Sequence, residues 1–261
     1  MIRRLEDVLA VTLFRRGATG LMPTMEAQLI FEEVDGLVRR IEGVGARIEE
    51  IASGRSVAFR LGATASVARG LVPRALRALG DGKTRPDLFF DVLSLDQIAD
   101  YLLDGTGQCV VTLAPIDHPM LTAEPLGSGQ LVAVIPAAHS LAKASSLSAS
   151  DFADIELISF QVDGPHQRAI RRFLGADPSG HTARTVVRFA DTAVAMASEG
   201  MAIALVDSFT TLGPVGSDVV VRPLDGQETA FSLYLQWNPN RPVSSHVAEL
   251  RRLLVTELSG A

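Results

Sequence analysis

The spacing of hydrophobic residues predicts one long helix early in the chain. From Ile30 to Ile51 apolar residues recur at alternating intervals of four and three, the heptad repeat of a coiled coil. The members of this seam are Ile30, Val34, Leu37, Ile41, Val44, Ile48 and Ile51. Charged residues flank the narrow seam on both sides. We therefore expect the helix to pair with a second copy of itself, and packing on the core of its own domain is the alternative.

The segment before this repeat predicts a helix followed by two short strands. Residues 2–11 resemble the end of an amphipathic helix, and residues 12–16 resemble a strand or an extended arm. Gly17 and Gly20 bracket a turn, from which residues 21–23 return. This is the order of elements after the recognition helix of a winged helix-turn-helix. Thr24 is then the expected N-cap of the long helix.

After residue 55 the pattern changes to alternating strands and helices. The expected strands are 57–61, 88–93, 108–113, 121–126, 130–136, 155–160, 185–189, 201–206, 219–221 and 231–236. The expected helices are 67–79, 96–103, 166–174, 191–199 and 243–258. This alternation predicts an α/β fold with parallel sheets and right-handed crossovers. Because the series runs twice, over 56–126 and 127–217, we expect two similar subdomains.

Composition and charge narrow the class of protein. The chain has 261 residues, a net charge of −6 and 47% hydrophobic residues, as in ordinary globular proteins. Residues 1–60 are electrically neutral, so the remainder carries the whole charge and argues against extensive nucleic-acid binding there. The single cysteine, Cys109, excludes a disulfide framework. No segment resembles a membrane span or a signal peptide, which predicts a cytoplasmic protein.

The sequence predicts no catalytic centre, and we expect no enzyme, no metal site and no cofactor. The histidines are His118, His139, His166, His181 and His246, and no pair has a metal-binding spacing. No serine lies in a nucleophile elbow, and no glycine-rich phosphate loop follows a strand. Cys109 lies within an expected strand, where a buried apolar role is the ordinary one.

Small polar or aromatic residues follow several of the expected strands. Ligands bind at this carboxyl edge in open α/β sheets, and helix N-termini there favour anionic groups. The candidate ligand-binding residues are Thr64, Ser66, Ser94, Gln161, Phe189 and Asp207. The alternative for the serines, Thr64 and Asp207 is a role in capping helices or turns.

The order of several short motifs resembles that of the LysR-type transcriptional regulators over essentially the whole chain. The motifs are Ile2-Arg-Arg-Leu-Glu6, Val11-Thr-Leu-Phe-Arg-Arg16, Leu21-Met-Pro-Thr-Met-Glu-Ala27, Leu71-Val-Pro73, Leu126 with Leu131-Val-Ala-Val-Ile-Pro136 and His139-Ser-Leu-Ala142, and Glu199-Gly-Met-Ala-Ile-Ala204. In the last of these, Ala202 replaces the second glycine of the family motif. Pro23 to Ala27 and Leu205-Val-Asp207 are similar to the branch that regulates opine and amino-acid catabolism.

The resemblance implies a remnant winged helix over 1–23, a dimerisation helix over 24–53 and a periplasmic-binding-protein-like effector domain over 56–261. Its subdomain I would take 56–126 and 228–261, and its subdomain II would take 127–227. The implied partners are a small-molecule effector, operator DNA and further copies of the chain in a homodimer or homotetramer. Ser66 falls at an effector-binding position of the family. A second such position falls at or beside Leu95, so Ser94 substitutes for it.

The chain departs from the family at its start, because Met1 stands inside the recognition helix. Arg3, Arg4, Arg15 and Arg16 remain as candidate phosphate contacts, which position a protein without specifying sequence, although surface arginines also occur by chance. We therefore expect weak or no operator binding by this chain. The alternatives to a regulator are an effector-binding, dimerising subunit that does not bind DNA and a cytosolic small-molecule binding protein or enzyme.

Overall fold

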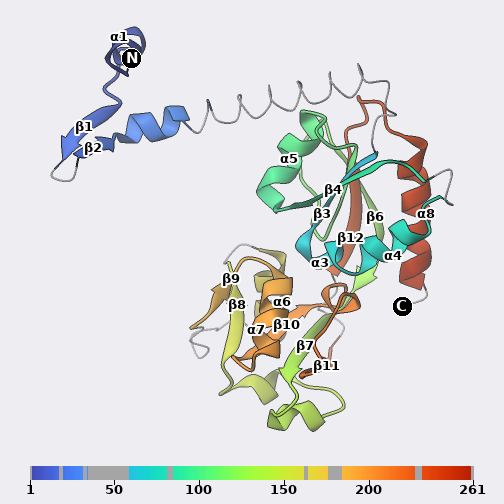
Figure 1. The fold of residues 1–261 in the computed structure, drawn as a ribbon. Coiled ribbons are helices and arrows are strands. Elements are labelled where there is room, and N and C mark those ends of the chain that lie inside the picture. The colour runs from blue at the N-terminus through green and yellow to red at the C-terminus, as the bar shows by residue number, and fades with distance from the viewer. Residues whose placement is uncertain are drawn as a thin grey trace. The chain divides into compact units, whose positions relative to one another are not determined.

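The computed structural model describes residues 2–17, 20–31, 34, 59–80, 85–161, 164–175, 184–226 and 231–259. The chain forms two compact units, Met1–Val57 and Ala58–Ala261, which are considered separately (Figure 1). In the part of the chain that is described, no helix has both the length and the apolar character needed to cross a membrane.

The first unit contains a helix and a β-hairpin, as the sequence predicts. Helix α1 (Ile2–Leu9) is followed by strands β1 (Phe14–Gly17) and β2 (Gly20–Pro23), which pair antiparallel. Glu6 joins the helix to the hairpin, because its Oε1 accepts hydrogen bonds from the backbone N–H groups of Leu13 and Phe14 at 2.7 and 3.1 Å.

Thr24 caps the helix that starts after the hairpin. Its Oγ1 accepts a hydrogen bond from the backbone N–H of Ala27 at 3.1 Å, which confirms the predicted N-cap. Residues 25–31 and 34 are helical. Most of the heptad seam lies outside the described residues, namely Leu37, Ile41, Val44, Ile48 and Ile51.

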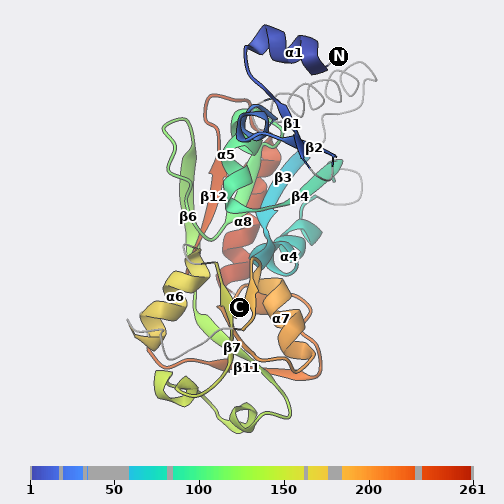
Figure 2. The ribbon, with the colours of Figure 1, turned by 90° about the vertical axis from the view of Figure 1, so that its left-hand side faces the viewer.

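The second unit has two lobes, each built on a five-stranded sheet (Figures 1 and 2). In chain order the first lobe contains β3 (Phe59–Thr64), α3 (Ala65–Ala68), α4 (Leu71–Arg77), β4 (Leu88–Leu93), α5 (Leu95–Leu103), β5 (Cys109–Thr112) and β6 (Thr122–Gly129), and later β12 (Phe231–Trp237) and α8 (Ser245–Ser259). The second lobe contains β7 (Leu131–Pro136), η1 (Ser140–Lys143), η2 (Ala149–Phe152), β8 (Leu157–Phe160), α6 (Pro165–Leu174), β9 (Val186–Val187), α7 (Ala190–Ser198), β10 (Ile203–Asp207), η4 (Thr210–Leu212) and β11 (Val219–Pro223). The predicted α/β class with two subdomains is confirmed.

The prediction of parallel sheets is wrong for half of each sheet. The first sheet has the order β4-β3-β5-β12-β6, and β12 runs antiparallel to both of its neighbours. The second has the order β11-β7-β10-β8-β9, and β7 runs antiparallel to both of its neighbours. The reason is that the chain crosses between lobes twice. Each crossing delivers a strand without an intervening helix, and a strand that enters directly from the other lobe is free to pair antiparallel.

The helix predicted over 67–79 is two helices, α3 and α4. Pro73 has no N–H and its ring would clash with the preceding turn of a continuous helix, so the chain breaks before it. Gly70 stands at the break, where a side chain would meet the backbone of Gly213 at 2.4 Å. The turn between α3 and α4 therefore packs directly on the second lobe.

Strand β9 is also shorter than predicted. It contains only Val186 and Val187, whereas the sequence predicts a strand over 185–189. Arg188 and Phe189 lie beyond its end, and Phe189 is the N-cap residue of α7. Gly105 and Gly200 lie just after α5 and α7, with φ of +68° and +75° that favour glycine at a helix end.

Buried aliphatic residues of both sheets form one continuous core. It extends from Phe59 and Leu61 in β3 to Ile203 and Leu205 in β10. A smaller cluster lies under α5 and contains Leu93, Ile98, Tyr101, Leu102 and Val110. This cluster holds α5 on its sheet and so fixes the helix whose N-terminus faces the second lobe.

Candidate functional site

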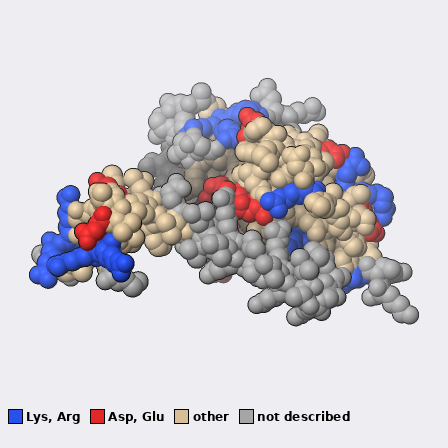
Figure 3. All heavy atoms as spheres, turned by 90° about the horizontal axis from the view of Figure 1, so that it is seen from above, with Lys and Arg blue, Asp and Glu red and all other residues tan. Residues whose placement is uncertain are grey.

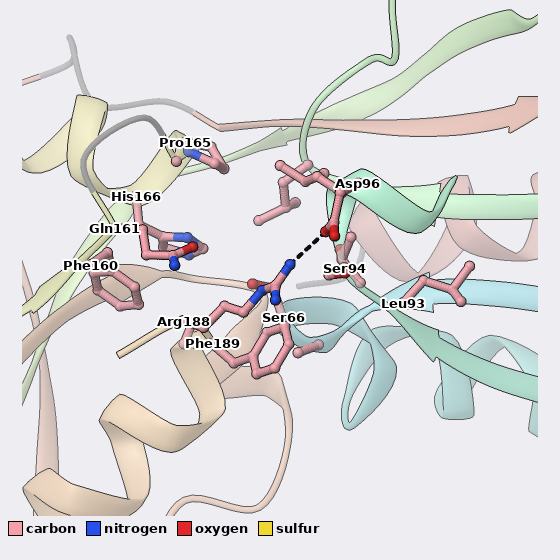
Figure 4. Close-up of a pocket in the computed structure, with 16 residues that line it drawn as sticks. Ser66, Leu93, Ser94, Asp96, Phe160, Gln161, Pro165, His166, Arg188 and Phe189 are labelled. Carbon is pink, nitrogen blue, oxygen red and sulfur yellow. Dashed lines mark hydrogen bonds and ion pairs between the residues drawn. The ribbon is translucent and has the colours of Figure 1, made fainter. Parts of the chain in front are cut away.

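A pocket of about 590 Å³ lies between the two lobes. Its walls come from the ends of β3, β4 and β5 in the first lobe and from the ends of β8 and β9 in the second. The lining residues are Thr64, Ala65, Ser66, Leu93, Ser94, Leu95, Asp96, Leu113, Phe160, Gln161, Gly164, Pro165, His166, Arg188, Phe189 and Ala190 (Figure 4). The volume suits a small organic molecule.

The structure brings together most of the residues that the sequence singles out for ligand binding. Five of them line the pocket, namely Thr64, Ser66, Ser94, Gln161 and Phe189. They meet because each follows a strand of one of the two sheets, and the carboxyl ends of those strands face one another across the cleft. Asp207, the sixth, does not line the pocket and lies behind its wall.

Three helices of nine or ten residues begin at the pocket wall. Ser94, Gly164 and Phe189 are the N-cap residues of α5, α6 and α7, and all three line the pocket. The free N–H groups and the dipole at a helix N-terminus favour negative charge. The backbone therefore makes the pocket suitable for an anionic group, independently of the side chains.

Thr64 and Ser66 add hydroxyl groups to this surface. The Oγ1 of Thr64 is buried and has no hydrogen-bond partner among the described residues. A buried hydroxyl without a partner is costly, so a polar ligand atom in the pocket would gain by pairing with it. The hydroxyl of Ser66, in contrast, hydrogen-bonds to the carboxylate of Asp207.

Asp207 is fully buried and supports the pocket from behind. Its Oδ2 lies 2.7 Å from Nε2 of His166, and its two oxygens accept hydrogen bonds from the backbone N–H and the hydroxyl of Thr210 at 2.9 and 2.7 Å. Burial by itself raises the pKa of this carboxyl, but the hydrogen bonds and charge of His166, with those of Thr210 and Ser66, hold the pKa below its ordinary value. Asp207 is therefore an ionised positioning group, which the structure places behind the pocket wall and not among the residues that line it.

His166 was not among the candidates from the sequence. It lies in the first turn of α6, and its ring stacks on Phe160 with centroids 4.7 Å apart. Phe231 contacts the ring at 5.3 Å. With Nε2 bound to Asp207, the imidazole has a fixed orientation in the pocket wall. The sequence feature that could have identified His166 is its position at the start of a helix that follows a buried strand.

Arg188 and Asp96 are two charged residues of the pocket wall that the sequence did not single out. The Nη2 of Arg188 lies 2.5 Å from Oδ1 of Asp96, so this ion pair joins the second lobe to the first (Figure 4). Hydrogen bonding from Ser94, with further help from the Arg188 guanidinium, holds the pKa of Asp96 below its ordinary value. A lone arginine at the end of an apolar strand was the signal for Arg188.

No metal centre is present among the residues that the structure describes, since no group of three or more His, Cys, Asp or Glu side chains converges there. Cys109 is buried in β5, and burial raises the pKa of its thiol. The described part of this site therefore offers hydrogen bonds, charge and apolar contact to a ligand.

The four candidate DNA-contacting arginines all lie on the first unit. Arg3 and Arg4 belong to α1, Arg15 and Arg16 belong to β1, and all four are exposed. Figure 3 shows basic side chains gathered on one side of this unit. Of the predicted dimerisation seam, Val34 is 49% exposed and Ile30 is partly buried.

Comparison with known proteins gives the family. The LysR substrate binding domain matches residues 52–259. Regulatory protein NocR of Agrobacterium tumefaciens (strain T37) is 21% identical over 225 residues, which are 86% of this chain and 75% of NocR. The HTH-type transcriptional regulator DgcR of a Pseudoalteromonas species is 20% identical over 216 residues, which are 83% of this chain and 74% of DgcR.

Solved structures share the fold. Full-length CbnR in complex with its target DNA has a TM-score of 0.68 and 15% sequence identity, over 98% of this chain and 87% of CbnR. The reduced OxyR regulatory domain has a TM-score of 0.64 and 14% identity, over 77% of this chain and 95% of that domain. Together with the domain match, these findings show that the chain belongs to the LysR family of transcriptional regulators and carries the family's substrate-binding domain.

Proposed function

We propose that the pocket between the lobes binds the small-molecule effector to which this LysR-family regulator responds. The observation that carries the proposal is the convergence of Thr64, Ser66, Ser94, Gln161 and Phe189 on one pocket of about 590 Å³. The N-termini of α5, α6 and α7 favour an anionic group on the effector. Leu113 and Phe160 supply apolar contact for the rest of the molecule.

An amino acid or an opine is the effector class that we favour. Both carry a carboxylate, which suits the three helix N-termini and the hydroxyls of the wall. The likeness of residues 23–27 and 205–207 to the opine and amino-acid branch supports the same class. Because the described residues of the pocket provide binding groups and no assembled catalytic set, a regulatory role is favoured over an enzymatic one.

Effector binding would act on the angle between the lobes. The lobes are connected at Gln130, whose backbone exchanges hydrogen bonds with Ser208 at 2.8 and 3.1 Å. The guanidinium of Arg74, in the first lobe, also donates to the backbone carbonyl of Leu212 in the second lobe at 2.8 Å. A ligand that contacts both lobes stabilises one angle over others, and that shift in population is the signal.

The remaining parts of the proposal come from the first unit and the linker. We propose that Arg3, Arg4, Arg15 and Arg16 contact DNA phosphates and that the seam from Ile30 to Ile51 joins two copies of the chain. We also propose that the protein acts in the cytoplasm, where its operator DNA lies.

A thermal-shift screen tests the effector site. Amino acids, opines and small carboxylates are added to the wild type, to Ser66→Ala and to Gln161→Trp, which fills the pocket from an exposed position. We expect an effector to raise the melting temperature of the wild type and to lose this effect in Gln161→Trp. Ser128→Ala, an exposed serine on β6 outside the pocket, is the control and should respond as the wild type does.

Two outcomes contradict parts of this proposal. Stabilisation that persists unchanged in Gln161→Trp places the binding site elsewhere. Stabilisation that persists unchanged in Ser66→Ala alone removes Ser66 from the site and leaves the pocket in place.

A further inference from the structure

The ion pair between Arg188 and Asp96 spans the mouth of the pocket. Arg188 follows β9 in the second lobe, Asp96 lies in the first turn of α5 in the first lobe, and both line the pocket. They are the only Arg, Lys, Asp or Glu side chains among the described residues that line it. A charged ligand therefore meets one cation and one anion, and these already neutralise each other.

Each member of this ion pair can readily change its partner. The side chains of Arg188 and Asp96 are 48% and 68% exposed. Exposed ion pairs contribute about 0–1 kcal/mol, because water solvates both charges well. The ion pair itself is thus a weak connection, and a ligand that offers each group a new partner loses little by breaking it.

Each group also keeps its place without the other. Asp96 lies in the first turn of α5, where the positive end of the helix favours its negative charge. The guanidinium of Arg188 lies over the ring of Phe189, 5.7 Å from its centroid. When the pair separates, both charges therefore remain at the pocket mouth, available to a ligand.

We propose that Arg188 and Asp96 form an exchangeable pair that selects zwitterionic ligands. The ligand's carboxylate takes the place of Asp96 on Arg188, and its ammonium takes the place of Arg188 on Asp96. This inference rests on the proposed function, since it assumes that the effector occupies this pocket. It adds the two residues that would recognise the ligand's two charges.

A ligand with a single charge leaves one partner unpaired. A monocarboxylate on Arg188 leaves Asp96 facing a second anion, and an amine on Asp96 leaves Arg188 facing a second cation. An α-amino acid carries both charges on one carbon and satisfies both residues at once. A ligand in the pocket shields both groups from water, and hydrogen bonds to charged groups then contribute about 1.5–3 kcal/mol each, so the loss of one ligand charge should weaken binding about tenfold or more.

The exchange also changes how the lobes are held together. Without ligand, Arg188 and Asp96 connect the lobes directly at 2.5 Å. With a zwitterion between them the connection passes through the ligand, so the two side chains no longer join the lobes directly. The lobes are also held by the close approach of Gly70 to Gly213 and by the hydrogen bond of Arg74 to Leu212. The same event therefore reports ligand charge and sets the lobe angle.

Isothermal titration calorimetry with matched compounds tests the proposal. The panel contains D- and L-amino acids, and each is compared with the 2-hydroxy acid and the primary amine of the same carbon skeleton. We expect the amino acid that binds best to the wild type to exceed its hydroxy acid and its amine by about tenfold or more in affinity.

Two neutralising variants assign the preference to the pair. Asp96→Asn should abolish the preference for the amino acid over the hydroxy acid, and Arg188→Gln should abolish the preference over the amine. Arg251→Gln removes a comparable pair outside the pocket, since Arg251 Nε lies 2.7 Å from Oε1 of Glu124, and should preserve both preferences. Urea midpoints of the three variants establish that each is folded.

Each result decides between the alternatives. Equal binding of the amino acid and its hydroxy acid by the wild type overturns the inference and leaves the effector pocket intact, as does a preference that survives Asp96→Asn. The inference also fails if no amino acid in the panel binds. The proposed function fails separately, when binding found in the broader screen persists after Gln161→Trp fills the pocket.

Discussion

Asp207 and His166 form a buried contact that connects the end of β10 to the start of α6, with Oδ2 and Nε2 2.7 Å apart. Asp207 is completely buried, and the His166 side chain is 10% exposed and lines the pocket. The contact explains how a carboxylate outside the pocket fixes a residue in its wall. It also explains why the charge is tolerated in the core, since His166 and Thr210 both hydrogen-bond to the carboxylate.

Replacing Asp207 by Asn should destabilise the second unit. The amide keeps the shape but removes the charge, and its NH₂ group faces either the imidazole or the hydroxyl of Thr210. We expect the free energy of unfolding to fall by about 2–4 kcal/mol, because the ionised carboxylate is lost while its buried partners His166 and Thr210 stay in place. Urea denaturation measures the change. Asp154→Asn, at an exposed position, is the control and should leave the midpoint unchanged.

The same carboxylate predicts a pH dependence of stability. The pKa of Asp207 is lowered in the folded state, so the contribution of its charge is complete above the unfolded pKa of about 3.9 and is lost as the pH falls through the folded value. We expect the difference in unfolding free energy between wild type and Asp207→Asn to shrink as the pH falls below about 4. A difference that grows on acidification contradicts this prediction.

The ligand-binding candidates show what strand patterns can and cannot predict. Thr64, Ser94 and Gln161 were found because a residue after a strand of an open α/β sheet lies at its carboxyl edge. The same rule selected Asp207, whose backbone does lie at that edge. Its side chain, however, enters the core, because His166 and Thr210 bind it there. A position directly after a strand predicts that the backbone lies at the carboxyl edge of the sheet. The direction of the side chain, in contrast, depends on packing.

The contacts between the lobes could not be predicted from the sequence. Arg188 and Asp96 are 92 positions apart and meet only because two sheets are docked face to face. The antiparallel course of β7 and β12 has the same origin, since it follows from the crossings between lobes. Local patterns predicted the helices and strands well because each is set by its own periodicity and caps.

Gly107→Ala should disturb the packing that holds α5 on its sheet. A Cβ at this position would lie 1.7 Å from Cε1 of the buried Tyr101 ring, which would have to move. Overpacking of a filled core costs about 1–3 kcal/mol, so we expect a lower urea midpoint. Gly164→Ala is the matched control, since its Cβ would make only an ordinary contact at 3.5 Å. Equal stability of the two variants contradicts the role of Tyr101 packing in holding α5.

The heptad seam predicts the oligomeric state. Ile41 is central to the repeat of apolar residues from Ile30 to Ile51, although it lies outside the described residues. Asp at this position would place a charge from each copy in an apolar seam, so Ile41→Asp should lower the mass found by sedimentation equilibrium toward that of one chain. Arg39→Asp adds the same residue at the outer f position of the repeat and should keep the wild-type mass. If Ile41→Asp also keeps the wild-type mass, the seam packs within its own chain and the copies associate through another surface.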